Sequence, residues 1–259
     1  MRPVIRMLGA IVLGTSIGVL PNVSAMATPP AKPYEFVVDN DIWQPGRRAR
    51  NGSDWLALHC LGAACRFAPA RLQVKAESWQ GHYDDRPTRG QRLNFRLVTP
   101  APGRTIAWFR VTAKHPPLSA GPVTTYASAA TPFKRPASEG TLEIAVDLPD
   151  GAQATLVPML DREAGAFRLQ LRAGGRRQLL GELGQCSREV SRNYLLWAGE
   201  LDGDGKPDYL VSFADADGQA ILLLSGAASG PEEPLVGVGG TYSYPPYGGE
   251  CDTQGWLAQ

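Results

Sequence analysis

The 259-residue sequence has few of the residues on which enzyme and metal motifs are usually built. It contains only three histidines, and His59, His82 and His115 form no pair with metal-binding spacing. It has no Gly-x-Ser-x-Gly elbow, no His-Glu-x-x-His helix motif and no glycine-rich phosphate-binding loop. The sequence therefore identifies neither a reaction nor a substrate.

The sequence also lacks a strong excess of charge of either sign. Lys and Arg number 26 and Asp and Glu number 25, which gives a formal net charge of +1. Proteins that bind nucleic acid or anionic membranes through their overall charge are usually strongly basic. The composition thus gives no support to a nucleic acid or a membrane surface as the partner.

The N-terminal segment has the three-part pattern of a secretory signal peptide. Arg2 and Arg6 precede an uncharged apolar run, and Ala25-Met26-Ala27 fits a small-x-small cleavage site. The run is shorter than the roughly 20 residues of a membrane-spanning helix. We expect a signal peptide over residues 1–27, a mature protein without a transmembrane span, and export to the periplasm or beyond the cell. A retained N-terminal anchor is the alternative.

All four cysteines follow this segment, and their even number in an exported chain predicts two disulfides. Three pairings are possible. We favour Cys60 with Cys65, which closes a tight loop around Gly62, and Cys186 with Cys251. A zinc site is the alternative, but the histidine spacing does not favour it.

No long amphipathic helix is visible, whereas apolar residues alternate with polar ones in many short segments. Examples are the segments 92–98, 105–112, 142–148 and 166–173. Nearly continuous apolar runs at 194–198, 209–213 and 220–224 indicate more central strands. Glycine- and proline-rich turns separate these segments. The pattern predicts an all-β fold of antiparallel strands in sandwich or propeller-like sheets.

A stretch rich in Ala, Ser and Pro, residues 126–140, separates two strand-rich halves. We expect an N-terminal β domain over residues 28–135 and a C-terminal β domain over residues 136–259. The alternative is a single domain with a long surface loop.

The most informative segment is GELDGDGKPDYLVSF, residues 199–213, in which oxygen-bearing residues alternate. A hard cation such as Ca²⁺ prefers six to eight oxygen ligands, which carboxylates along a curled loop can supply. A helix-loop-helix calcium hand does not fit, because its twelfth position is Val211 and strands flank the loop. Magnesium and a plain turn are the alternatives, but four carboxylates in nine residues repel one another unless they are compensated. The predicted ligands are the side chains of Glu200, Asp202, Asp204 and Asp208 and the carbonyl of Lys206.

The segment LDGDGKPDYLVSF resembles the calcium loop of FG-GAP (VCBS-type) repeats, in which Asp-x-Asp-Gly-x-x-Asp precedes an apolar strand. The resemblance covers about residues 194–225 and implies that the loop joins two antiparallel strands and holds calcium. It departs from the family at Glu200, where Asp or Asn is usual.

These features together predict an exported calcium-binding β protein that acts as a binding or structural module, with a glycan or a protein as its ligand. The alternative is an exported hydrolase of glycans or peptides with a structural calcium ion. A pocket that joined His82 to a nucleophile would favour the hydrolase.

Overall fold

The structure is a computed structural model. It describes residues 34–46, 49–80, 85–112, 118–133, 143–161, 166–183, 194–213, 219–231 and 233–243. Within these ranges the chain forms sixteen β-strands and one short 3₁₀-helix, η1 (Ser225–Ala227). All of the strand pairings are antiparallel. The predicted all-β, antiparallel class is therefore confirmed. No helix in the described ranges has the length and apolar content that a membrane crossing requires.

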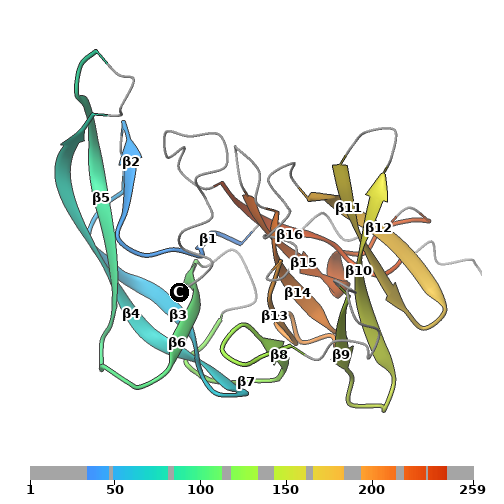
Figure 1. The fold of residues 1–259 in the computed structure, drawn as a ribbon. Coiled ribbons are helices and arrows are strands. Elements are labelled where there is room, and N and C mark those ends of the chain that lie inside the picture. The colour runs from blue at the N-terminus through green and yellow to red at the C-terminus, as the bar shows by residue number, and fades with distance from the viewer. Residues whose placement is uncertain are drawn as a thin grey trace, which may run out of the picture.

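The N-terminal half forms a seven-stranded, curled sheet (Figure 1). Its strands follow the order β1-β6-β3-β4-β5-β2, and β7 pairs with β4. The bounds are β1 (Phe36–Val37), β2 (Ile42–Pro45), β3 (Gly52–Leu61), β4 (Ala64–Trp79), β5 (Thr88–Leu97), β6 (Arg104–Arg110) and β7 (Gly121–Val123).

Two further sheets contain the remaining strands. The five-stranded sheet has the order β16-β15-β14-β13-β8, and the four-stranded sheet has the order β12-β11-β10-β9. The five-stranded sheet comprises β8 (Thr125–Ser128), β13 (Leu195–Gly199), β14 (Asp208–Phe213), β15 (Gln219–Leu224) and β16 (Gly237–Ser243). The four-stranded sheet comprises β9 (Ile144–Asp147), β10 (Gln153–Asp161), β11 (Ala166–Ala173) and β12 (Arg176–Leu183).

The five-stranded sheet lies between the other two and is buried on both faces (Figure 1). Successive side chains of a strand point to opposite faces, so an apolar run supplies both faces at once. In β14, Leu210 packs into a core shared with the seven-stranded sheet. Its neighbours Tyr209 and Val211 pack into a second core shared with the four-stranded sheet. The continuous apolar runs thus mark central strands, as the sequence predicts.

Several contacts connect the N-terminal and C-terminal halves. Strand β8 pairs with β13 in the five-stranded sheet, although β7, which directly precedes it in the chain, belongs to the seven-stranded sheet. The amide of Tyr34 donates a hydrogen bond of 2.7 Å to the carbonyl of Gly239. Residues 134–142 around the predicted domain boundary lie outside the described residues. The division at 135/136 stays a prediction.

One of the two expected disulfides lies in the described part of the chain. Cys60 and Cys65 face each other across the β3–β4 hairpin and are joined by a disulfide, which confirms this pairing. The turn between the two strands contains Gly62 at φ 60°, a left-handed conformation that glycine adopts readily. Cys186 and Cys251 lie outside the described residues, as do His82 and the predicted signal peptide of residues 1–27.

The half-buried carboxyl of Asp39 lies at a contact between the N-terminal and C-terminal halves. We expect it to make the stability of the protein depend on pH. Asp39 Oδ2 accepts a hydrogen bond of 3.5 Å from the hydroxyl of Tyr242 in β16. Burial raises the pKa of Asp39 to about 7, and the hydrogen bond from Tyr242 opposes this shift. An unfolded Asp has a pKa of about 3.9. The folded state therefore holds the proton more tightly, and the free energy of unfolding falls as the pH rises from about 4 to about 7.

We expect the substitution Asp39→Asn to remove this contribution, because asparagine stays neutral and can still accept the Tyr242 bond. The free energy of unfolding of the variant minus that of the wild type should rise by about 1–2 kcal/mol as the pH is raised from about 4.5 to about 8, after allowance for partial solvent access. Urea unfolding of both proteins at the two pH values measures the difference. A difference that is the same at both values would contradict the prediction.

Candidate metal centre

The acidic loop, residues 200–207, connects the paired central strands β13 and β14. Gly203 has φ 84° and Gly205 has φ 78°, values in the left-handed region that other residues rarely adopt. No atom lies within 4 Å of a Cβ built at either glycine, so backbone conformation alone makes glycine suitable there. The two glycines let the chain curl tightly enough to bring nearby carboxylates together.

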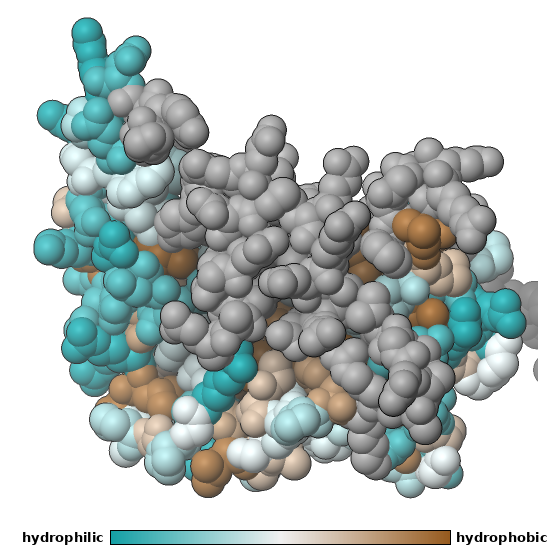
Figure 2. Space-filling view, in the orientation of Figure 1, coloured by the Kyte–Doolittle hydropathy of each residue, from teal (hydrophilic) through white to brown (hydrophobic). Residues whose placement is uncertain are grey.

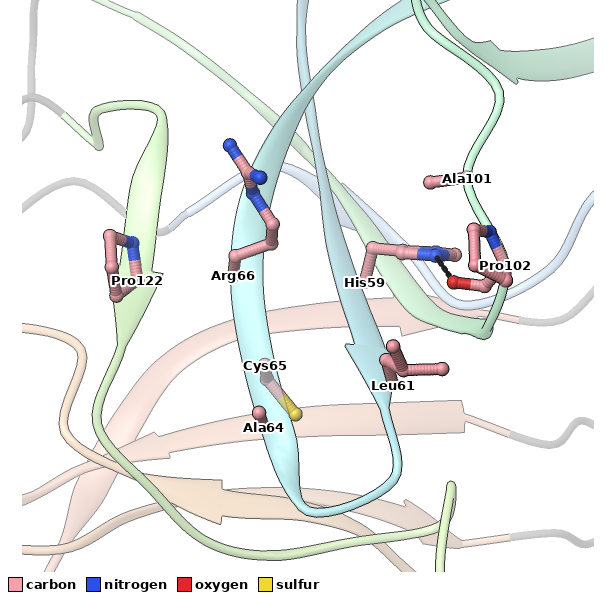
Figure 3. A pocket seen from close by; sticks show the side chains of 8 residues that line it. All are labelled: His59, Leu61, Ala64, Cys65, Arg66, Ala101, Pro102 and Pro122. Carbon is pink, nitrogen blue, oxygen red and sulfur yellow. Dashed lines mark hydrogen bonds between the residues drawn. The ribbon is translucent and has the colours of Figure 1, made fainter.

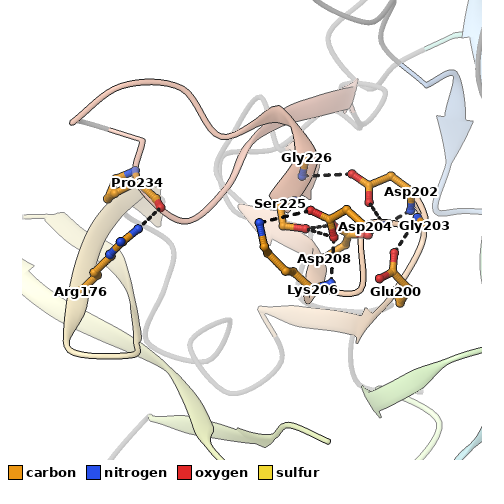
Figure 4. A network of polar contacts seen from close by, with 10 residues as sticks. All are labelled: Arg176, Glu200, Asp202, Gly203, Asp204, Lys206, Asp208, Ser225, Gly226 and Pro234. Atoms are coloured by element: carbon orange, nitrogen blue, oxygen red, sulfur yellow. Dashed lines mark hydrogen bonds and ion pairs between the residues drawn. The ribbon is translucent and has the colours of Figure 1, made fainter. Parts of the chain in front are cut away.

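Asp208, the first residue of β14, holds the acidic loop in place through hydrogen bonds. Its side chain is fully buried. Oδ2 accepts hydrogen bonds from the amides of Leu201, at 2.7 Å, and Asp202, at 3.3 Å. Oδ1 accepts bonds from the amide of Ser225, at 2.8 Å, and from its hydroxyl, at 3.1 Å (Figure 4). Asp208 therefore ties the acidic loop to η1, which follows β15.

Asp202 and Glu200 lie in the acidic loop itself. Asp202 Oδ2 accepts a bond of 3.1 Å from the amide of Gly226 in η1, and Oδ1 accepts one of 3.2 Å from the amide of Asp204. Glu200 Oε1 accepts a bond of 2.7 Å from the amide of Gly203. The other oxygen, Glu200 Oε2, is buried and has no hydrogen-bond partner. A buried carboxylate oxygen without a hydrogen-bond partner is costly in free energy.

Glu200, Asp202 and Asp208 form a compact group of carboxylates, which we call the acidic triad. One oxygen from each residue lies within 4.8 Å of the oxygens from the other two. Burial, and to a smaller extent the charge of Asp204, raises the pKa of Asp202. Burial likewise raises the pKa of Asp208 to about 7. The charged triad therefore costs free energy that a bound cation would offset.

Asp204 and Lys206 are not members of this group, although the sequence pattern includes them among the ligands. Asp204 Oδ1 accepts bonds from the amide of Lys206, at 2.8 Å, and from the hydroxyl of Ser225, at 2.9 Å. The ammonium of Lys206 lies 3.9 Å from Asp204 Oδ2, and its side chain is 71% exposed. Whether these two residues bind an ion stays a prediction.

Sequence reasoning did not find Ser225 and Gly226, which supply donors to Asp202, Asp204 and Asp208. Both residues lie 17 to 24 positions from the acids that they contact. Their donors are mostly backbone amides, which every residue except proline carries. No residue type in the sequence therefore marks them.

The described chain also contains an open pocket of about 550 Å³, at the end of the β3–β4 hairpin (Figure 3). His59 lines it, but both ring nitrogens are engaged: Nε2 donates to the carbonyl of Pro102 at 2.9 Å, and Nδ1 lies 3.0 Å from the hydroxyl of Thr105. Cys65, which also lines the pocket, is held in the disulfide. The side chains of His59 and Cys65 are thus already engaged within the protein.

Comparisons of the chain with models of known protein families, with curated proteins and with solved structures give no match. The fold and the site therefore define a class only: an antiparallel β protein of three sheets, with an acidic triad where the strands β13 and β14 of its central sheet are connected.

Proposed function

We propose that the protein is an exported calcium-binding β protein in which Ca²⁺ stabilises the β13–β14 strand-loop-strand unit. The single observation that carries this proposal is the acidic triad: one oxygen from each of its three residues lies within 4.8 Å of the other two, and Glu200 Oε2 is buried without a hydrogen-bond partner. The three carboxylates form an all-oxygen donor set, which hard cations prefer. Calcium is favoured over magnesium, because magnesium usually retains several waters and binds through one or two carboxylates.

The position of the loop indicates what the ion does for the protein. The loop is bonded to η1 through Asp208 and Asp202, so an ion at the triad would fix the ends of β13, β14 and β15 at once. The similarity of the segment to FG-GAP-type calcium loops supports the same arrangement. The role is structural: the ion holds the central sheet, which supports a binding surface elsewhere on the molecule.

Removal of calcium is expected to lower the melting temperature. Extracellular calcium modules bind with dissociation constants of about 10⁻⁴ to 10⁻³ M. A ligand at a hundred times its dissociation constant stabilises the folded state by about 2.7 kcal/mol. For a chain of this length, chelation should then lower the melting temperature by about 5–10 °C. Thermal unfolding with excess calcium and with chelator measures the effect, and titration calorimetry measures the binding.

The substitution Glu200→Gln should abolish most of this calcium response, because it removes one charge of the triad and keeps the side-chain size. Glu233→Gln is a matched control: Glu233 accepts a bond of 2.9 Å from Ser229 and is not a triad member. It should keep the full response. An unchanged melting temperature on chelation, with no heat of binding up to about 10 mM calcium, would show that the loop is only a turn.

A further inference from the structure

The seven-stranded sheet has an exposed polar face on β4 and β5. Along both strands, one set of alternating side chains enters the core, as Leu72, Leu93 and Phe95 do. The other set points away from them, because successive side chains of a strand alternate. This second set consists of the cross-strand pairs Arg71–Arg96, Gln73–Asn94 and Lys75–Arg92, followed by Glu77. We call these seven residues the β4–β5 strip.

The strip carries a surplus of positive charge. Arg71 and Arg96 lie directly opposite each other, both are exposed, and no acid in the described chain forms an ion pair with either. Like charges in directly opposite positions destabilise a sheet. Asn94 Oδ1 accepts a bond of 3.1 Å from Arg96 Nε, which holds this guanidinium in place. The pair therefore costs stability in the free protein, and an anionic ligand would remove this cost.

The other end of the strip is compensated. Arg92 makes two bonds of 2.9 Å with the carboxylate of Glu77 and approaches Asp41 at 3.4 Å. The charge surplus thus lies at Arg71, Arg96 and Lys75, with the two amides Gln73 and Asn94 between the cations. Figure 2 shows hydrophilic residues along the side of the molecule that β4 and β5 form in Figure 1.

We propose that the β4–β5 strip binds a linear polysaccharide that carries carboxylate groups. A guanidinium binds a carboxylate through two parallel hydrogen bonds, so the arginine pair can hold the acidic groups. The amides of Gln73 and Asn94 can each donate to and accept from sugar hydroxyls. The strip from Arg71 to Glu77 is about 20 Å long at about 3.3 Å per residue, which suits an extended chain better than a compact ligand.

The chemistry of the strip favours a polysaccharide over two other polyanions. A lipid surface binds through apolar side chains as well as cations. The exposed large hydrophobic residues of the described chain are Leu61, Val98, Leu160, Leu179 and Val238, none of which belongs to the strip. Single-stranded nucleic acid needs exposed rings on which bases stack. Trp43, beside the strip, is buried, and Trp79, which follows Glu77 on the same face, is half-buried against the Trp43 ring at the end of β4 remote from the Arg71–Arg96 pair, so no exposed ring lies beside these arginines.

The four-stranded sheet provides a matched control for the arginine pair. Arg172 and Arg177 are directly opposite each other on β11 and β12, and Arg172 bonds Gln170 at 2.7 Å much as Arg96 bonds Asn94. There, however, Gln170 faces Leu179, which is 48% exposed, so no polar strip continues from the pair.

The test measures binding of the whole protein, in excess calcium, to carboxymethylated dextran and to unmodified dextran of the same length. We expect binding to the carboxymethylated polymer only, weaker at high salt. R71Q/R96Q should weaken this binding by about tenfold or more, which corresponds to about 1.4 kcal/mol. Its melting temperature should not fall, because the substitution relieves repulsion. R172Q/R177Q should bind like the wild type.

Four outcomes would overturn the proposal. Equal binding to both dextrans would show that the carboxylates are not recognised. Equal losses in R71Q/R96Q and R172Q/R177Q would show unspecific attraction to any basic surface. Tighter binding to a thymidine oligonucleotide, or to vesicles containing anionic phospholipid, would assign the strip to a different partner. Loss of binding together with a lower melting temperature in R71Q/R96Q would show a structural role for the pair.

Discussion

The substitution Asp208→Ala is expected to lower the free energy of unfolding by about 2–4 kcal/mol in chelator, and by more in excess calcium because it also removes a member of the acidic triad. The fully buried carboxylate accepts hydrogen bonds from the amides of Leu201, Asp202 and Ser225 and from the Ser225 hydroxyl. Alanine leaves these donors without an acceptor, and each unsatisfied buried donor costs about 1–3 kcal/mol. The relief of a buried charge offsets only part of the loss. Chemical denaturation of the variant, with calcium and with chelator, measures the change.

Asp204→Ala separates this structural role from the general effect of removing a negative charge. The Asp204 side chain is 26% exposed and bonds the Lys206 amide and the Ser225 hydroxyl. Its loss should cost about 1 kcal/mol, because water can reach the donors that it leaves. If Asp204→Ala destabilises the protein as much as Asp208→Ala, Asp208 is not the anchor that the hydrogen bonds indicate.

The fold class could be predicted from the sequence because strand periodicity is local information. The segment 209–213 is apolar at nearly every position, and the structure buries both of its faces. In β11, Leu169 and Leu171 enter a core while Gln170 stays half-buried, as the alternation indicates. The partition into three sheets, and the pairing of β8 with β13, depend on contacts across more than 60 residues. Such long-range pairings leave no local pattern.

The acidic residues of the candidate site could be predicted from the sequence, but their arrangement in space could not. The spacing of Glu200, Asp202, Asp204 and Asp208 points to one cluster, but a curled loop directs side chains that are only two residues apart to different points. Asp204 turns toward Ser225, while Glu200, which departs from the FG-GAP pattern, lies in the acidic triad. The extra methylene of glutamate extends its reach, which explains how this residue reaches Asp202 and Asp208 from the end of β13.

The largest effect outside the loop is expected from Trp197→Ala. Trp197 lies in β13, is 1% exposed, and packs in the core between the five-stranded and seven-stranded sheets. Its indole Nε1 donates a bond of 3.1 Å to the Thr125 hydroxyl in β8. Removal of a buried tryptophan leaves a large cavity and costs about 3–5 kcal/mol. The melting temperature should fall by about 10 °C or more in calorimetry.

The central sheet contributes side chains to both cores. Removal of the Trp197 side chain should therefore lower the stability of all three sheets. We expect calorimetry to show one transition, and hydrogen exchange to accelerate in β3 of the seven-stranded sheet as well as in β11 of the four-stranded sheet. Leu169→Ala, in the opposite core, is the matched variant. It should lower the free energy of unfolding by about 2–5 kcal/mol and leave a single transition. Two transitions, of which Trp197→Ala lowers one and Leu169→Ala the other, would instead show that the two cores unfold as separate units. The sharing of one core between Trp55 and Leu58 of β3 and Trp197 and Leu222 of the central sheet is the reason to expect a single unit.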